Sequence, residues 1–106
     1  MKEQDLETVM GLIMFGGDAK GKAAQAITAA KQFDFEQAEQ KIQEATQALN
    51  QAHKAQTKLL TQEASGDTIR VSLLMVHGQD HLMNAITFID MAKEMVDVYR
   101  QLARVR

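Results

Sequence analysis

The sequence predicts an all-α protein, an antiparallel bundle of three long helices forming a single domain over residues 1–106. Three observations support this prediction. Proline is absent and only six glycines occur, so turn-forming residues are too few for a β fold. Apolar residues recur every three or four positions along three segments, as they do on one face of a helix. A length of 106 residues fits one compact domain.

The first helix is expected at residues 5–30. Apolar side chains recur at helical spacing from Leu6 to Ala30. The pair Gly16-Gly17 interrupts them, and each glycine in a helix interior costs about 1 kcal/mol relative to alanine. Four interpretations stay open for this pair: a kink, a break, the close approach of another backbone, or a helix that tolerates both glycines.

The second helix is expected at residues 35–64. Asp34 is a good N-cap, and Gln37 completes a capping-box pattern. Gly66 is expected to take the left-handed position after the helix, and Asp67 to cap the helix that follows. The seam of this helix alternates by three and four residues and consists largely of small side chains: Phe35, Ala38, Ile42, Ala45, Leu49, Ala52, Gln56 and Leu59.

The third helix is expected at residues 68–103. Its first half, residues 69–83, is apolar on all sides, whereas two neighbouring helices cover only part of a helix circumference. This segment therefore predicts self-association, with a homotrimer favoured, and the alternative is a monomer with exposed Leu and Met side chains. The second half is amphipathic, with five residues predicted to face inward: Phe88, Met91, Met95, Val98 and Leu102.

A polar stripe interrupts the apolar first half. His77, Asp80, His81 and Asn84 are spaced i, i+3, i+4 and i+7, which places them on one helix face. Polar groups in an apolar helix cost free energy unless they are satisfied, so they indicate a function. A neutral imidazole is a good nucleophile near neutral pH. Because Gly78 follows His77 and would leave its ring reachable by a docking protein, His77 is the predicted catalytic residue of a phosphoryl transfer.

The third histidine, His53, lies on the second helix. A hairpin that pivots at Gly66 would place His53 opposite Gln79 and Gln56 opposite Val76, so the two polar clusters are predicted to face each other. For His53 and His81 an ordinary structural role, with the ring hydrogen-bonded, is the alternative.

Asp80 has a separate possible role. It shares a stripe with Leu73, Val76 and Met83, and three such stripes on a threefold axis would bring three carboxylates together. Converging carboxylates need a cation or shared protons, and a hard ion such as Mg²⁺ prefers oxygen ligands. A catalytic metal site made by His77, Asp80 and His53 would need a coincidence of helix register and is disfavoured.

Composition excludes several classes of protein. The net charge is −2 and no basic block stands out, which argues against nucleic-acid binding. Cysteine is absent, so disulfides and thiol chemistry are excluded. The first residues do not form a signal peptide, and the most apolar stretch, Leu73 to Val76, is too short to cross a bilayer. A cytoplasmic protein is expected.

Three motifs carry a resemblance to a known family: Gly11–Ala19, Asp34-Phe35 followed by Asn50–Thr57, and Val76–Met83, which reads VHGQDHLM. With them the chain resembles, over essentially its whole length, the enzyme IIA component of the lactose/cellobiose class of the bacterial phosphoenolpyruvate-dependent sugar phosphotransferase system. The resemblance implies a homotrimeric nine-helix bundle.

It also implies a reaction. His77 would accept phosphate, at its tele nitrogen, from the carrier protein HPr and donate it to a cysteine of the IIB component. Asp80 would bind a structural Mg²⁺ at the trimer axis. Four further residues would line the active-site region: His53, Gln56, Gln79 and His81. Two alternatives stay open, namely a histidine phosphotransfer domain in signalling and a non-catalytic helical assembly module.

Overall fold

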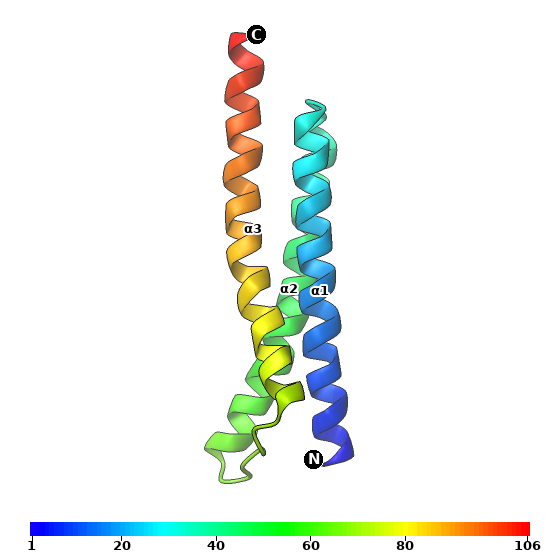
Figure 1. Ribbon diagram of the computed structural model, residues 1–106, viewed down its shortest axis with the longest axis vertical. Coiled ribbons are helices and arrows are strands. Elements are labelled where there is room, and N and C mark those ends of the chain that lie inside the picture. The colour runs from blue at the N-terminus through cyan, green and yellow to red at the C-terminus, as the bar shows by residue number, and fades with distance from the viewer.

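The computed structural model describes residues 1–106 as three helices that run up, down and up (Figure 1). α1 covers Glu3–Lys31, α2 covers Phe35–Ala64 and α3 covers Leu73–Val105. Together they form a rod with extents of 58 × 20 × 18 Å. The N-terminus and the α2–α3 connector lie at one end of the rod, and the C-terminus lies toward the end with the α1–α2 turn (Figure 1). The predicted antiparallel three-helix bundle is confirmed.

None of the three helices contains a stretch long and apolar enough to span a membrane.

The core has two parts of different character. α1 packs against both other helices, while α2 and α3 contact each other less. The half near the C-terminus is packed mostly by alanines, such as Ala23, Ala45 and Ala92, which let helices approach closely. The half near the α2–α3 connector is packed by larger side chains, including Leu12, Leu59 and Leu82. The predicted polar stripe of α3 lies on this second half, next to the part of the core that contains the larger apolar side chains.

α1 extends slightly beyond the predicted residues 5–30 and is unbroken through Gly16-Gly17. The pair marks a close approach of α3. A Cβ atom on Gly16 would lie 3.1 Å from the carbonyl carbon of His81, tighter than ordinary packing allows. Of the four interpretations of this pair, the structure supports the close approach of another backbone.

α2 begins and ends as predicted. The Asp34 carboxylate accepts a hydrogen bond from the backbone N–H of Gln37 at 3.2 Å, and Gly66 has a φ of 96°. The second half of the capping box is missing, because the backbone N–H of Asp34 donates to the carbonyl of Ala29. Phe33, in the α1–α2 turn, takes the left-handed conformation with a φ of 59°.

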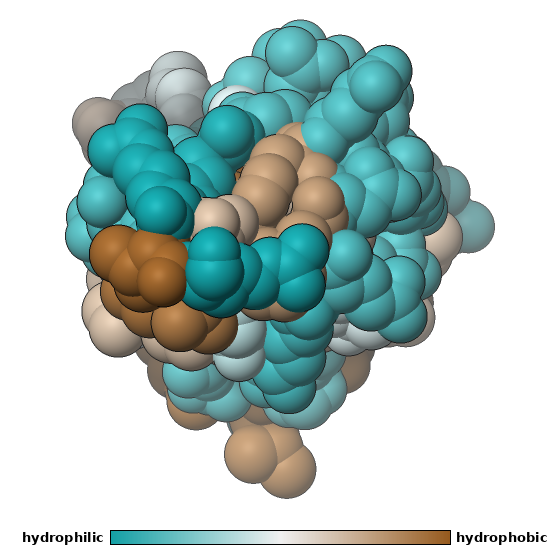
Figure 2. All heavy atoms as spheres, turned by 90° about the horizontal axis from the view of Figure 1, so that it is seen from above, coloured by the Kyte–Doolittle hydropathy of each residue, from teal (hydrophilic) through white to brown (hydrophobic).

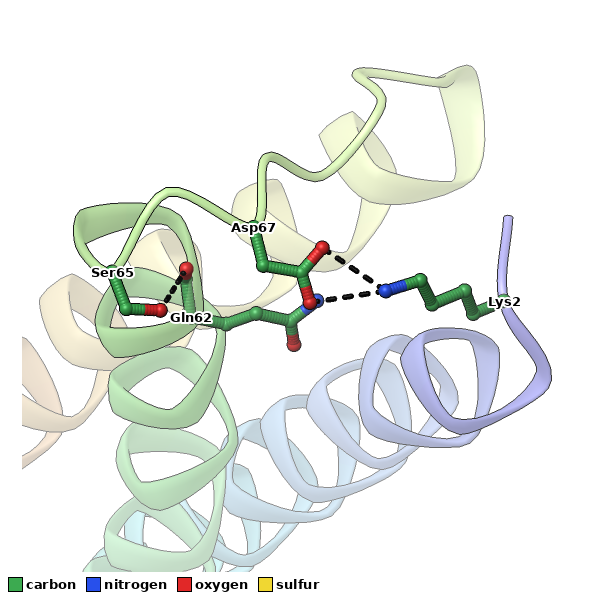
Figure 3. A network of polar contacts seen from close by, with 4 residues as sticks. All are labelled: Lys2, Gln62, Ser65 and Asp67. Atoms are coloured by element: carbon green, nitrogen blue, oxygen red, sulfur yellow. Dashed lines mark hydrogen bonds and ion pairs between the residues drawn. The ribbon is translucent and has the colours of Figure 1, made fainter.

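The predicted start of α3 at residue 68, with Asp67 as its cap, is wrong. Ser72 is extended, and its hydroxyl accepts a hydrogen bond from the backbone N–H of Met75 at 3.1 Å, so the helix begins at Leu73. Asp67 instead binds the ammonium group of Lys2, with both carboxylate oxygens 3.0 Å from Nζ (Figure 3). This hydrogen bond raises the pKa of Lys2 above its ordinary value. The contact connects the start of α1 to the α2–α3 connector.

The inward face of α3 also differs from the prediction. Phe88 and Met95 are half-buried, but Met91, Val98 and Leu102 are exposed. In this half of α3 the buried residues are smaller ones, each one position after a predicted residue: Ile89, Ala92 and Val96. The prediction selected the largest side chains, whereas tight packing against α1 requires small ones.

Consequently α3 presents an apolar face to the outside of the three-helix bundle. We call it the outer stripe of α3; its apolar members are Leu73, Val76, Met83, Met91, Val98, Leu102 and Val105. Asp80 lies within this stripe, between Val76 and Met83, as predicted. Seen along the rod from above, most surface atoms are hydrophilic and the hydrophobic atoms are grouped in separate patches (Figure 2).

Candidate functional site

The polar stripe of α3 forms two side-chain pairs. The imidazole rings of His77 and His81 meet edge to face, with centroids 4.4 Å apart and an interplanar angle of 74°. Asn84 donates a 2.9 Å hydrogen bond from Nδ2 to Oδ1 of Asp80. Each pair is spaced i, i+4, so the helix itself brings the partners together. His77, Asp80 and Asn84 are exposed, and His81 is half-buried. The His77 ring is therefore accessible from solvent and supported from one side by a second imidazole.

Gly78 has a different role from the predicted one. It is buried, and a Cβ atom there would lie 3.1 Å from Cδ2 of Leu12 and 3.5 Å from Cγ1 of Val9. The missing side chain makes room for α1 and not for a docking protein. His77 is the next residue and is turned about 100° around the helix from this contact, so it is exposed while Gly78 lets α1 and α3 approach closely.

A glutamine pair joins the site to α2. Gln56 donates a 2.8 Å hydrogen bond from Nε2 to Oε1 of Gln79, and both side chains are half-buried. The two polar clusters do face each other, but the predicted register, with His53 opposite Gln79, is wrong. Residues 67–72 after Gly66 form a non-helical connector, which moves the pivot of the hairpin away from that glycine. His53 is exposed on α2 and makes no hydrogen bond.

The glycine pair of α1 lies directly beside the site. A Cβ atom on Gly17 would be 3.7 Å from Nδ1 of His81, at ordinary contact distance. An open pocket of about 150 Å³ lies next to this contact. Its lining comes from α1 and α3: Gly16, Gly17, Lys20, Asp80, His81 and Asn84. Lys20 was not predicted as a site residue, although its spacing from Gly16 and Gly17 (i+4 and i+3) places it on the same helix face.

The residues of one chain offer a nucleophile and few metal ligands. No three His, Asp or Glu side chains of the chain come close enough together to hold a metal ion. An exposed imidazole with neighbouring His and amide groups suits nucleophilic attack on a phosphoryl group, where positioning and hydrogen-bond donors supply most of the catalysis. Fold and site together define a small all-helical protein with an exposed imidazole that could act as a nucleophile.

Residues 7–100 match the family model described as PTS system, lactose/cellobiose specific IIA subunit. The chain belongs to this family, whose members are components of the sugar phosphotransferase system. The match includes the whole polar stripe of α3 and the Gln56–Gln79 pair.

Individual relatives agree with this assignment. The chain is 55% identical over 94 residues to the PTS system galactose-specific EIIA component of Lactococcus lactis subsp. cremoris, which covers 89% of this chain and 81% of that protein. The crystal structure of the PTS cellobiose-specific enzyme IIA from Bacillus anthracis superposes with a TM-score of 0.94 at 38% identity, over 98% of this chain and 95% of that one.

A third relative was solved together with a partner. It is the IIA(Chitobiose)–HPr complex of the N,N'-diacetylchitobiose branch of the Escherichia coli phosphotransferase system. The matching chain has a TM-score of 0.82 at 37% identity, and the alignment covers 96% of this chain and 99% of that one.

Proposed function

We propose that the protein is a phosphoryl carrier in which His77 accepts a phosphoryl group from HPr and donates it to a cysteine of a IIB component. The observation that carries the proposal is the accessible His77 ring, held edge to face against His81 on the one polar stripe of α3. Membership in the lactose/cellobiose IIA family supports a role in sugar uptake.

The proposed chemistry consists of two nucleophilic displacements. In the first, a nitrogen of the neutral His77 imidazole attacks the phosphorus of phosphohistidine on HPr, and the N–P bond to HPr breaks as the bond to His77 forms. In the second, a thiolate of IIB attacks the same phosphorus, and the bond to His77 breaks. By family resemblance the reacting nitrogen is the tele nitrogen, Nε2. His53, Gln56, Gln79 and His81 are the proposed neighbours of the reacting ring.

HPr as the donor is supported by the complex of the related chitobiose-branch IIA with HPr. A partner protein needs a reachable imidazole, and the exposure of His77 meets this requirement. A protein that exchanges a phosphoryl group with HPr and a IIB component is expected to act in the cytoplasm. The relatives serve galactose, cellobiose and chitobiose, and accordingly we propose a lactose/cellobiose-type sugar without naming one.

We further propose a homotrimer in which the outer stripes of three α3 helices meet. The stripe leaves Val76 52% and Met83 56% exposed in the protomer, and an apolar helix face of this length needs a cover. Asp80 lies between these two residues, so three Asp80 carboxylates would converge on the axis. Such a set of oxygen ligands fits a hard cation, and Mg²⁺ would offset the repulsion among the three negative charges.

The direct test is phosphorylation in vitro. The protein is incubated with phosphoenolpyruvate, enzyme I and HPr, and its intact mass is measured. Wild type should gain about 80 Da, the mass of one phosphoryl group. The gain should vanish in His77→Ala and persist at the end point in His81→Ala and His53→Ala, which serve as matched histidine controls. A label that remains on His77→Ala would refute the assignment.

A further inference from the structure

The second glycine of the pair in α1 is placed against the site, and its contact differs from that of the first. Gly16 faces the backbone of His81, where an added Cβ atom would be only 3.1–3.2 Å from its neighbours. Gly17 faces the ring of His81: an added Cβ atom would lie 3.7 Å from Nδ1 and 3.9 Å from Cε1. Gly16 therefore lets the backbones of α1 and α3 approach closely, while Gly17 leaves the His81 ring without a side-chain neighbour on this part of α1.

The His81 ring in turn touches His77. The two rings meet at 74° with centroids 4.4 Å apart, slightly closer than the separation of about 4.5–7 Å typical of aromatic pairs. Among the polar contacts of the structure, neither ring forms a hydrogen bond that would fix its orientation. Packing is thus what holds the pair: α1 on one side of His81, and His81 on one side of His77.

We propose that Gly17 is a positioning residue for phosphoryl transfer: its missing side chain leaves the space beside the His81 ring open, and His81 orients the His77 ring. This inference rests on the proposed function of His77. A methyl group at position 17 fits at ordinary contact distance, so a γ atom that pointed from there toward the ring would have to displace it. Reaction rates fall steeply when a reacting group is displaced by about 1 Å.

The chain offers a matched control. Gly21 lies one turn further along α1, is exposed like Gly17, and has no atom within 4 Å of an added Cβ. A β-branched residue has the same intrinsic helix propensity at both positions, and in a helix its side chain is held to one strongly preferred χ1 rotamer. The comparison of Gly17→Val with Gly21→Val therefore isolates the contact with His81 from effects on the helix and on its outer surface.

The experiment measures the rate of phosphoryl transfer from phosphorylated HPr, as a function of HPr concentration, by rapid quenching and intact mass. Gly21→Val should transfer within about twofold of wild type. Gly17→Val should lower the maximal rate at least tenfold with an unchanged KM for HPr, since docking is not affected. If Gly17→Val does not fold, judged by circular dichroism and by particle mass, Gly17→Thr replaces it.

A double variant tests the route through His81. His81→Ala should slow the reaction by itself, and adding Gly17→Val to it should cause no further loss, because the ring on which residue 17 acts is gone. Equal losses in Gly17→Val and Gly21→Val, an unchanged rate in Gly17→Val, or a full additional loss in the double variant would each overturn the proposal. A label that survives His77→Ala would instead refute the proposed function, so the two failures are distinguishable.

Discussion

Gln56 and Gln79 form the one side-chain hydrogen bond that joins α2 to α3 beside the polar stripe, with Nε2 of Gln56 2.8 Å from Oε1 of Gln79. Both amides are half-buried, and they lie in the half of the rod packed by Leu12, Leu59 and Leu82. The pair matches the register between the two helices, since a shift by one residue would leave both amides without partners.

This contact predicts energetic coupling between the two glutamines. Gln56→Leu and Gln79→Leu should each destabilise the protein by about 1 kcal/mol, since each leaves one half-buried amide unsatisfied. The double variant should cost less than the sum, with a coupling of about 0.5–1.5 kcal/mol. Urea denaturation of the four proteins measures this. Strict additivity would mean that the hydrogen bond contributes nothing in solution.

Gly78→Ala should destabilise the protein although alanine is the better helix former. The added Cβ atom would lie 3.1 Å from Cδ2 of Leu12, and separating α1 from α3 is expected to cost about 1–3 kcal/mol. Gly21→Ala, where the space is open, should stabilise by about 0.5–1 kcal/mol. Thermal unfolding of both variants checks the opposite signs. If Gly78→Ala were as stable as Gly21→Ala, the close packing of α1 on α3 would be in error.

Ser72→Ala should remove the N-cap of α3 and cost about 1 kcal/mol, since the N–H of Met75 loses its acceptor. Thr68→Ala is the matched control, because Thr68 is exposed and forms no side-chain hydrogen bond. Chemical denaturation of the two variants distinguishes the observed helix start at Leu73 from a start at residue 68. A larger loss for Thr68→Ala would favour the earlier start.

The proposed trimer predicts distinct effects at two positions of the outer stripe. Asp80→Leu should leave the trimer intact and remove any dependence of the melting temperature on Mg²⁺, because the carboxylates that need a cation are gone. Val76→Asp should weaken the assembly, since it adds charges to the same apolar face. Leu60→Asp, at an exposed apolar position of α2, is the control and should keep the wild-type mass. Sedimentation equilibrium gives the masses. A monomeric Asp80→Leu variant would mean that the axis lies elsewhere.

The sequence predicted the helices well where local chemistry determines their ends. Asp34 caps α2, and Gly66, with its positive φ, follows its end; these are properties of single residues and their nearest neighbours. The start of α3 was missed because Asp67 was expected to cap this helix, whereas Ser72 caps it. Asp67 is taken by Lys2, a residue 65 positions away in the chain, and such a contact is not visible in local sequence.

The site, too, was predicted only where it depends on neighbours within one helix. The pair His77–His81 follows from spacing on one helix and could be predicted. The partner of Gln79 depends on the register between two helices, which is set by the shape of the connector. The roles of Gly17 and Gly78 depend on how closely α1 and α3 approach, and periodicity carries no information on that distance. Met91, Val98 and Leu102 were wrongly predicted to face inward because this distance between the helices was unknown.

The position of His77 along the rod has a practical consequence for experiments on single molecules. His77 lies in the second turn of α3, whereas Arg106 lies at the far end, with its guanidinium 4.0 Å from the centroid of the Phe33 ring. At 1.5 Å per residue the 29 intervening steps separate the two by about 43 Å. A dye, biotin or bead linked near Arg106 would therefore lie far from a donor protein bound at His77. Binding of the donor could then be recorded without the label blocking it.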